Sequence, residues 1–285
     1  MNKYTCDIMN FSDRIIRPPF EARSIFLQVT SGCSHNSCKF CDYYKNTSFK
    51  ISSEEEVIID LKELHDRKVA HNRVWLLSAD PFGLDYERLC SIAELIGKHL
   101  PYVNSIGCYA RVDSLKDKSI RQLKELKKLG YESIVFGVES CDDKLLDYMN
   151  KGYCSDDVIE QIRKMDEANM GYTFTFLNGM GGHDYGLNHA IQTAKVFNKM
   201  NPERIMINRL TIRENTPLYS KVENNIFEMP TEKECIRELM TFIDKLEIDT
   251  FIDATNNTNI IPFFGKTTNK ENILDKLNDE IKRFK

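Results

Sequence analysis

The stretch Cys33-Ser-His-Asn-Ser-Cys38-Lys-Phe-Cys41 follows the apolar run Ser24-Ile-Phe-Leu-Gln-Val-Thr30, and the rest of the chain is organised around it. Three thiols within nine residues predict a metal site. Soft sulfur ligands select zinc or an iron–sulfur cluster over magnesium or calcium. In a four-iron cluster, three cysteines leave one iron open to a ligand from outside the protein.

A structural zinc knot is the alternative interpretation of the same stretch, with His35 as the fourth ligand beside the three cysteines. His35 lies inside the loop, which is a poor position from which to close a tetrahedron. Zinc sites usually take two pairs of ligands from separate segments. The spacing therefore favours a cluster, with zinc as the competing hypothesis.

Apolar strands alternate with amphipathic helices along the 285 residues of the chain. Strands are predicted at about 25–30, 74–77, 105–110, 133–138, 172–177 and 204–210. Helices are predicted after capping boxes that begin at Ser53 and Thr231, and after Ser155 as an N-cap. Further helices are predicted at about 86–99, 119–129, 144–150, 187–200 and 270–284.

Six βα units with nearly continuous apolar strands predict parallel pairing, with the helices outside the sheet. Right-handed crossovers curl such a sheet. The expected fold is therefore α/β, a partial (β/α)6 barrel of parallel strands with a C-terminal extension. The expected boundaries are an N-terminal lead at 1–24, the core barrel at 25–215, and a helical extension at 216–285 that packs on the barrel's open side.

Chemically unusual residues follow the predicted strands. The sites of such barrels lie at the carboxyl ends of the strands. We therefore expect a single site that gathers the three cysteines, Asp80, Arg111, Glu139, the glycine-rich segment 179–182, Arg209 and Arg213.

With Phe40 just before its last cysteine, the stretch resembles the cluster loop of the radical SAM superfamily, whose common form is C-x3-C-x2-C with an aromatic residue at that place. The first spacing here is C-x4-C, one residue longer. The resemblance covers roughly 25–212 and implies an open (β/α)6 barrel with a 4Fe-4S cluster on Cys33, Cys38 and Cys41. It also implies that S-adenosylmethionine (SAM) binds the open iron and is cleaved by one electron, and that the 5′-deoxyadenosyl radical then abstracts hydrogen from a substrate.

The resemblance further implies SAM contacts at two turns. Ser78, Ala79 and Asp80 stand where the family has a Gly-Gly-Glu-like turn that holds the methionine amino group. Glu139 and Ser140 stand at the family's ribose position. For Asp80, the competing interpretation is an ordinary turn residue ahead of Pro81.

Three more residues are candidates for cofactor binding. Arg163 could pair with the methionine carboxylate, Gly179 could let the backbone approach the adenine, and Arg111 could reach either SAM or the substrate. An arginine on a helix is more often solvated surface. A Gly-Met-Gly-Gly segment without the spacing of a P-loop is often only a flexible loop.

A partly cationic mouth suggests an anionic, carboxylate-bearing substrate. The residues at the strand ends that could form it are Arg111, Arg209, Arg213, Tyr43, Tyr44 and His183, and some of these will pair with acidic neighbours instead. Cys108, Cys141 and Tyr43 are candidate catalytic residues, because a thiol or a phenol could donate a hydrogen atom to a substrate radical. The ordinary interpretation of Cys108 and Cys141 is that they are small buried apolar residues.

Composition restricts the class of protein. With 41% hydrophobic and 29% charged residues, the chain is typical of a globular protein. The sequence shows no membrane span and no secretory signal, and nine cysteines indicate a reducing compartment, so a cytoplasmic location is expected. A net charge of −4 argues against a nucleic-acid partner.

The favoured function is a radical SAM enzyme that acts on an unidentified small substrate and takes its electron from a donor such as flavodoxin or ferredoxin. One alternative is a non-catalytic relative that binds SAM and a cluster and works as a carrier or chaperone. The other alternative is a zinc-stabilised binding module.

Overall fold

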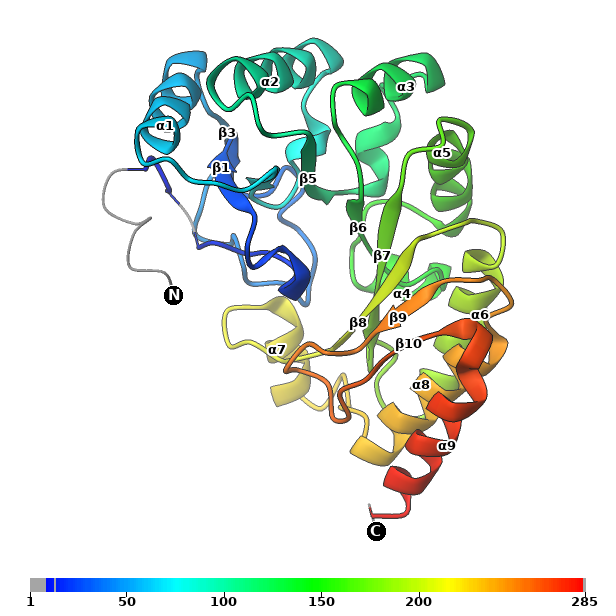
Figure 1. Ribbon diagram of the computed structural model, residues 1–285. Coiled ribbons are helices and arrows are strands. Elements are labelled where there is room, and N and C mark those ends of the chain that lie inside the picture. The colour runs from blue at the N-terminus through cyan, green and yellow to red at the C-terminus, as the bar shows by residue number, and fades with distance from the viewer. Residues whose placement is uncertain (1–8, 13, 284–285) are drawn as a thin grey trace.

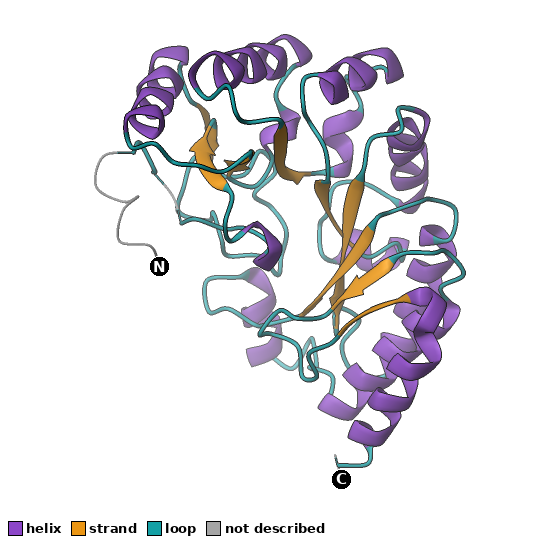
Figure 2. Ribbon diagram, in the orientation of Figure 1, coloured by secondary structure: helices purple, strands orange, loops and turns teal. Residues whose placement is uncertain are grey.

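The structure is a computed structural model that describes residues 9–12 and 14–283. The first eight residues and residue 13 of the expected N-terminal lead lie outside the described residues, as does position 284, the last of the final predicted helix. Helices cover the outer side of a curved sheet, and Figures 1 and 2 show this arrangement.

The main sheet has eight strands in the order β1-β4-β5-β6-β7-β8-β9-β10. All neighbouring strands are parallel except β9 and β10, which pair antiparallel. Within the described chain, no pairing joins β1 to β10, so the partial parallel barrel is confirmed and these strands are its edges. The strands are β1 (Ile25–Gln28), β4 (Arg73–Leu77), β5 (Ser105–Ala110), β6 (Ile134–Glu139), β7 (Tyr172–Asn178), β8 (Arg204–Arg209), β9 (Phe251–Asp253) and β10 (Phe264–Lys266).

A separate hairpin of two short strands flanks the cysteine stretch. Its strands are β2 (Thr30–Ser31) and β3 (Lys50–Ile51), and they pair antiparallel. The cysteines lie in the loop between these strands, so the hairpin closes the base of that loop.

The predicted helices are found with small shifts at their ends. They are α1 (Glu54–Asp66), α2 (Tyr86–His99), α3 (Ile120–Lys128), α4 (Asp143–Tyr148), α5 (Ser155–Glu167), α6 (Gly186–Phe197), α8 (Glu232–Lys245) and α9 (Lys270–Ile281). The capping boxes at Ser53 and Thr231 are confirmed. The predicted cap at Ser155 is wrong, because α5 begins there and Cys154 is the N-cap, whose N–H donates to Asp157 at 3.0 Å.

The hydrophobic core lies between the sheet and the helices. All seven residues of β7 are buried, as expected for a central parallel strand covered on both faces. Phe176 of β7 stacks on Phe242 of α8 with ring centroids 4.0 Å apart. The helix α8 therefore packs on the barrel as the partner of the sixth unit.

The C-terminal part departs from the expected helical extension in two ways. A short helix, α7 (Pro217–Glu223), precedes α8. Strands β9 and β10, of three residues each, continue the main sheet beyond β8. Such short strands carry no periodic pattern, so only the pairing of β9 with β8 and of β10 with β9 reveals them. Among the described residues, no helix is both long enough and apolar enough to cross a membrane.

Candidate active site at the strand ends

A cavity of about 380 Å³ opens at the carboxyl ends of the barrel strands. The three cysteines border it, and so do residues from the ends of β4, β5, β6 and β8. Of the residues predicted to form the site, those that border the cavity are Cys33, Cys38, Cys41, Tyr43, Tyr44, Ser78, Ala79, Arg111, Glu139, Arg209 and Arg213. The expected gathering at one end of the barrel is thus largely observed.

Neighbouring backbone fixes the path of the cysteine loop. The N–H of Lys39 donates to the carbonyl of Met149 at 3.0 Å. Gly32, just before the first cysteine, has a φ of +72°, and a Cβ there would stand 2.8 Å from the carbonyl oxygen of Ser48. A side chain at this position would be strained and would clash, so the turn into the loop requires glycine.

The three thiols are partly exposed and differ in their electrostatic surroundings. Burial raises the pKa of Cys41 to about 11. Burial also opposes ionisation of Cys38, but the charge of Lys151, with smaller contributions from His35 and Arg111, outweighs it and lowers the pKa of Cys38. Because the thiolate is the form that ligates metals, Lys151 favours the ligating form of Cys38.

The donor set fits a cluster better than a single zinc ion. Zinc–sulfur bonds of about 2.3 Å would bring the ligand atoms to within roughly 4 Å of one another. Within the described part of the chain, the three ligand side chains whose donor atoms lie within 4.8 Å of each other are His183, Asp184 and Glu234, and the cysteines form no such group. Nε2 of His35 is hydrogen-bonded to the carbonyl oxygen of Asn150 at 2.7 Å. Thiols set wider apart suit the corners of an iron–sulfur cube.

Asp80 is buried and holds three loops together. Its Oδ1 accepts from the N–H of Arg111 at 3.0 Å and from the hydroxyl of Ser114 at 2.6 Å, while Oδ2 accepts from the hydroxyl of Ser34 at 2.8 Å. Burial raises its pKa, against those three hydrogen bonds. Asp80 does not border the cavity, so the predicted contact between its carboxylate and SAM lacks support in the structure. Its hydrogen bonds position the three loops instead.

The turn at Ser78 and Ala79 keeps a glycine-like path without glycine. Ser78 has a φ of +98°, a conformation that glycine adopts without strain. Its hydroxyl donates to the carbonyl of Gly32 at 2.6 Å, and the N–H of Ala79 donates to the same oxygen at 3.4 Å. These bonds join the end of β4 to the start of the cysteine loop. Ser78 and Ala79 both border the cavity, which is where their predicted role requires them to be.

Glu139 ends β6 in a strained conformation. Its φ is +68°, and the register of β6 against β7 shifts between Phe136 and Glu139. Oε2 is buried and lacks a hydrogen-bond partner in the described part of the protein. Burial raises the pKa of Glu139, opposed by Lys151 and by a hydrogen bond with Thr175. Strain and an unused buried acceptor beside a cavity are typical of a ligand-binding carboxylate.

Lys151 is a site residue that the sequence analysis missed. It is 5% exposed, and its Nζ donates to the carbonyl of Gly137 at 2.7 Å. No carboxylate of the described residues lies within 4.0 Å of this cation, which stands 5.4 Å from the ring centre of Tyr153. Burial opposes its charge, but Tyr153, Cys38 and Glu139 outweigh burial and raise its pKa. The signal in the sequence is weak, a lysine between the turn residues Asn150 and Gly152.

Arg111 borders the same part of the cavity but is already paired. Its Nε lies 2.9 Å from Oδ1 of Asp113, and Nη2 donates to the carbonyl of Lys151 at 2.8 Å. Burial lowers its pKa, but the contact with Asp113 outweighs burial and raises it overall. Lys151 is therefore the less neutralised of the two cations beside the cysteine loop.

Besides Asp80 and His183, five predicted site residues do not border the cavity. Cys108 and Cys141 are buried in the hydrophobic core, and burial raises both thiol pKa values, so neither is placed to donate a hydrogen atom. Ser140 is buried, and its hydroxyl accepts from the N–H of Asp142. The side chain of Arg163 is exposed on α5, and the N–H of Gly179 donates to Glu238. The predicted contacts of Ser140, Arg163 and Gly179 with SAM therefore lack support in the structure.

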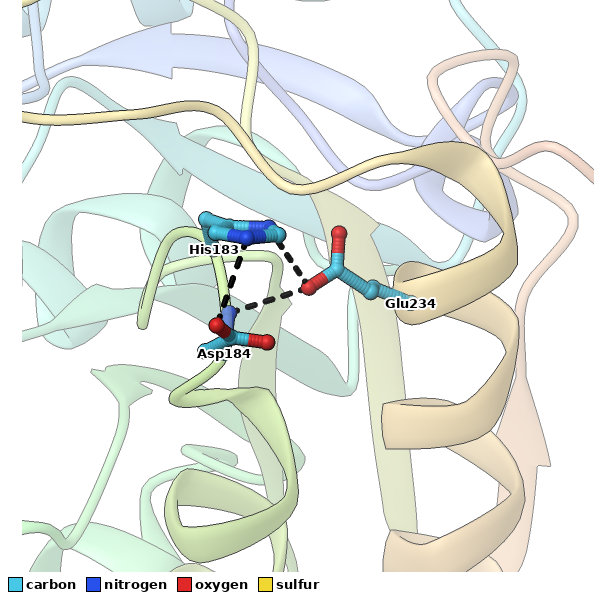
Figure 3. A group of neighbouring side chains, drawn as sticks. All are labelled: His183, Asp184 and Glu234. Atoms are coloured by element: carbon cyan, nitrogen blue, oxygen red, sulfur yellow. Dashed lines mark hydrogen bonds and ion pairs between the residues drawn. The ribbon is translucent and has the colours of Figure 1, made fainter.

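His183, predicted to lie at the cavity mouth, contacts Asp184 and Glu234 instead, as Figure 3 shows. Its Nδ1 lies 2.9 Å from Oε1 of Glu234, and its Nε2 lies 3.3 Å from Oδ2 of Asp184. The hydrogen bond to Glu234 raises the pKa of His183. Burial opposes ionisation of Glu234, but hydrogen bonds from Asp184, Thr231 and His183 lower its pKa to about 2. Contacts of the imidazole with two carboxylates account for this geometry without a metal ion and tie the β7–α6 loop to α8.

The family model described as the radical SAM superfamily matches residues 27–196. The heme chaperone HemW of Bacillus subtilis (strain 168) is 22% identical over 227 residues, which are 75% of this chain and 58% of HemW. An uncharacterised protein of Methanocaldococcus jannaschii is 23% identical over 248 residues, which are 83% of this chain and 73% of that protein.

Solved structures show the same fold. Methylornithine synthase (PylB) has a TM-score of 0.54 at 18% identity, over 79% of this chain and 63% of that one. HydG, a maturase of the [FeFe]-hydrogenase, has a TM-score of 0.52 at 17% identity, over 79% of this chain and 50% of HydG. The chain thus spans less than two thirds of HemW, PylB and HydG.

Proposed function

Because this chain belongs to the radical SAM superfamily, we propose that it is an enzyme that cleaves SAM reductively and removes hydrogen from a small substrate held in the strand-end cavity. Its cofactors are a 4Fe-4S cluster and SAM. When bound, they supply the 5′-deoxyadenosyl radical that starts the reaction. The observation that carries the proposal is the meeting of Cys33, Cys38 and Cys41 with Glu139 and Lys151 around one cavity.

The residues beside the cysteine loop suit the two ends of SAM. Lys151 places an unpaired cation beside Cys38, where it would receive the methionine carboxylate in the role first predicted for Arg163. Glu139 offers a buried acceptor for hydroxyl or amino groups. Ser78 and Ala79 border the same space and would hold the amino group through their backbone. Asp80 and Asp113 keep Arg111 and the cysteine loop in position.

Anaerobic reconstitution with iron and sulfide tests the proposal. After dithionite reduction, we expect a low-temperature EPR signal of a reduced 4Fe-4S cluster that shifts when SAM is added, and 5′-deoxyadenosine detectable by chromatography. A colourless protein that holds one tightly bound zinc ion would contradict it. The electron donor in the cell would be a flavodoxin or ferredoxin, and we infer a cytoplasmic location from the cysteine content of the chain.

A carrier or chaperone that binds the cluster and SAM without turnover is the second candidate, favoured by the similarity to HemW. Two measurements separate it from the enzyme. A carrier would give the SAM-dependent EPR shift without forming 5′-deoxyadenosine together with a product. If its cargo were heme, added hemin would also develop a shifted and saturable Soret band.

A further inference from the structure

Three segments that carry none of the cysteines form another part of the cavity wall. They are the chain before η1 (Pro19–Glu21), which contributes Arg17, the end of β8 with the residues after it, and the loop after β9. Hydrogen bonds lock the last two together, because the N–H of Arg209 donates to the hydroxyl of Thr258 at 3.2 Å and Nδ2 of Asn259 donates to the carbonyl of Ile207 at 2.8 Å. These hydrogen bonds therefore hold this part of the wall in a defined conformation.

Two arginines on this wall carry charge that the described residues do not neutralise. Among those residues, no carboxylate lies within 4.0 Å of the guanidinium of Arg17 or Arg213. Arg17 donates one hydrogen bond, to the carbonyl of Pro18 at 3.1 Å, and its guanidinium makes no other with the described residues. Arg209 differs, since its Nη1 lies 3.7 Å from Glu232. Arg17 is half-buried and Arg213 is exposed, so an anion that enters the cavity can reach both guanidinium groups.

Asn208, at the end of β8, supplies a third group to the same wall. It borders the cavity, and its side-chain oxygen is buried without a hydrogen-bond partner in the described part of the protein. An unsatisfied buried acceptor costs about 1–3 kcal/mol unless a ligand supplies a donor. The wall therefore combines guanidinium donors for an anion with one acceptor for an N–H or O–H group.

We propose that Arg17, Arg213 and Asn208 bind the substrate, and that the substrate carries a carboxylate or phosphate group next to a hydroxyl or amino group. That the bound molecule is a substrate rests on the proposed function. The anion site itself rests on two arginines that have no carboxylate of the described residues within 4.0 Å. SAM also has a carboxylate, but Lys151, beside Cys38, is assigned to it. The proposed substrate site uses other residues of the same cavity wall.

Small anions serve as probes of the proposed site. Isothermal titration calorimetry would be run on the full chain, reconstituted and saturated with SAM, with inorganic phosphate, glycolate and acetate in turn. Phosphate binding tighter than glycolate would indicate a phosphorylated substrate, and the reverse would indicate a carboxylate. Glycolate should bind more tightly than acetate, because its hydroxyl can donate to Asn208, and Asn208→Ala should abolish that difference.

Charge-removing variants locate the site. Arg17→Gln and Arg213→Gln should each weaken binding of the preferred anion about tenfold, since each removes a charge-assisted hydrogen bond. Arg237→Gln, an exposed arginine on α8, should leave the affinity unchanged. Circular dichroism checks that each variant folds, and if one does not, the other variant tests the proposal. Arg17→Lys, which keeps the charge, should retain part of the affinity.

Three outcomes would overturn the inference: no anion binding by the wild type, equal binding by wild type and both glutamine variants, or competition of the anion with SAM. Competition would place the anion at Lys151 instead. The two proposals fail separately. Anion binding without 5′-deoxyadenosine formation would remove the enzymatic function and leave the anion site, whereas SAM cleavage without anion binding would remove only the site.

Discussion

At the scale of single residues, the site depends on residues whose burial or backbone conformation is energetically unfavourable. Glu139 has a left-handed backbone and an unsatisfied buried oxygen, and Lys151 is a buried cation with no carboxylate of the described residues within 4.0 Å. Burying charge is unfavourable unless a partner is present. Both residues border the cavity with the three cysteines, so a bound ligand would supply the interactions that the protein leaves unused.

Cys38→Ala should prevent cluster assembly and leave the barrel folded. Cys38 lies in a loop and is partly exposed, so its loss removes a ligand without opening the core. Iron and sulfide content after reconstitution should fall to background, while the circular dichroism spectrum stays that of the wild type. Cys154→Ser, at an exposed cysteine, is the matched control and should keep a full cluster. Full iron in the Cys38 variant would refute the ligand assignment.

Lys151→Met should weaken SAM binding by roughly tenfold to a hundredfold, because a charge-assisted hydrogen bond contributes about 1.5–3 kcal/mol. Equilibrium dialysis of the reconstituted protein with labelled SAM measures the change. Lys144→Met, an exposed lysine on α4, should bind SAM as the wild type does. Unchanged binding in the Lys151 variant would show that another group receives the carboxylate.

At the scale of elements, the loops at the strand ends are fastened to one another rather than left free. Asp80 joins the loops after β1, β4 and β5 through Ser34, its own backbone and Arg111. Glu238 of α8 accepts from the N–H of Gly179 at 3.0 Å and from buried His189 at 2.7 Å. Helix α8 therefore holds the glycine-rich loop after β7 from outside the barrel. The contact of His183 with Glu234, also on α8, fastens the next residue of the same loop.

The contact between His183 and Glu234 should make stability depend on pH. The folded-state pKa of His183 is raised above its ordinary value of 6.5, so the stabilisation is complete below about pH 6.5 and is lost as the pH rises through the folded pKa. His183→Gln should therefore lower the melting temperature slightly at pH 6 and leave it unchanged at pH 8.5. Differential scanning calorimetry at the two pH values tests this. An equal loss at both would mean that the ring acts through packing and not through charge.

At the scale of the whole molecule, the C-terminal part extends the sheet of the partial barrel and adds to the cavity wall. Strand β9 pairs with β8, and the loop after β9 supplies Asn256, Asn257 and Thr258 to the cavity wall. The segment before β1 supplies Arg17 from the other end of the chain. This wall of the cavity is thus built from segments far apart in the sequence.

Asn259→Ala should destabilise this closure. Its side-chain amide donates to the carbonyls of Ile207 at 2.8 Å and Ala254 at 3.0 Å, and leaving these acceptors unpaired should cost about 1–3 kcal/mol of unfolding free energy. Urea unfolding followed by circular dichroism measures the loss. Asn272→Ala, at an exposed asparagine of α9 in the same region, should change stability little. Equal stability of both variants would mean that the loop after β9 is held by other contacts.

Much of the fold was predictable because its signals are local. The six core strands are apolar runs bounded by turn residues, and two of the three predicted helix caps are confirmed. The strands β9 and β10 were not predicted, since three residues carry no period and the strands form by pairing of β9 with β8 and of β10 with β9. The predicted cap at Ser155 is wrong although capping is local, because Cys154 and Asp157 occupy the capping positions instead.

The sequence by itself determined the metal chemistry and the order of strands and helices, because ligand type and hydrophobic period are properties of neighbouring residues. Only the tertiary structure decided which strand-end side chains face the cavity. It turned Asp80 toward Arg111 and Ser34, left Arg163 exposed on α5, and brought Lys151 beside Cys38. Residues far apart in the chain meet there through packing and hydrogen bonding, and no local pattern encodes those contacts.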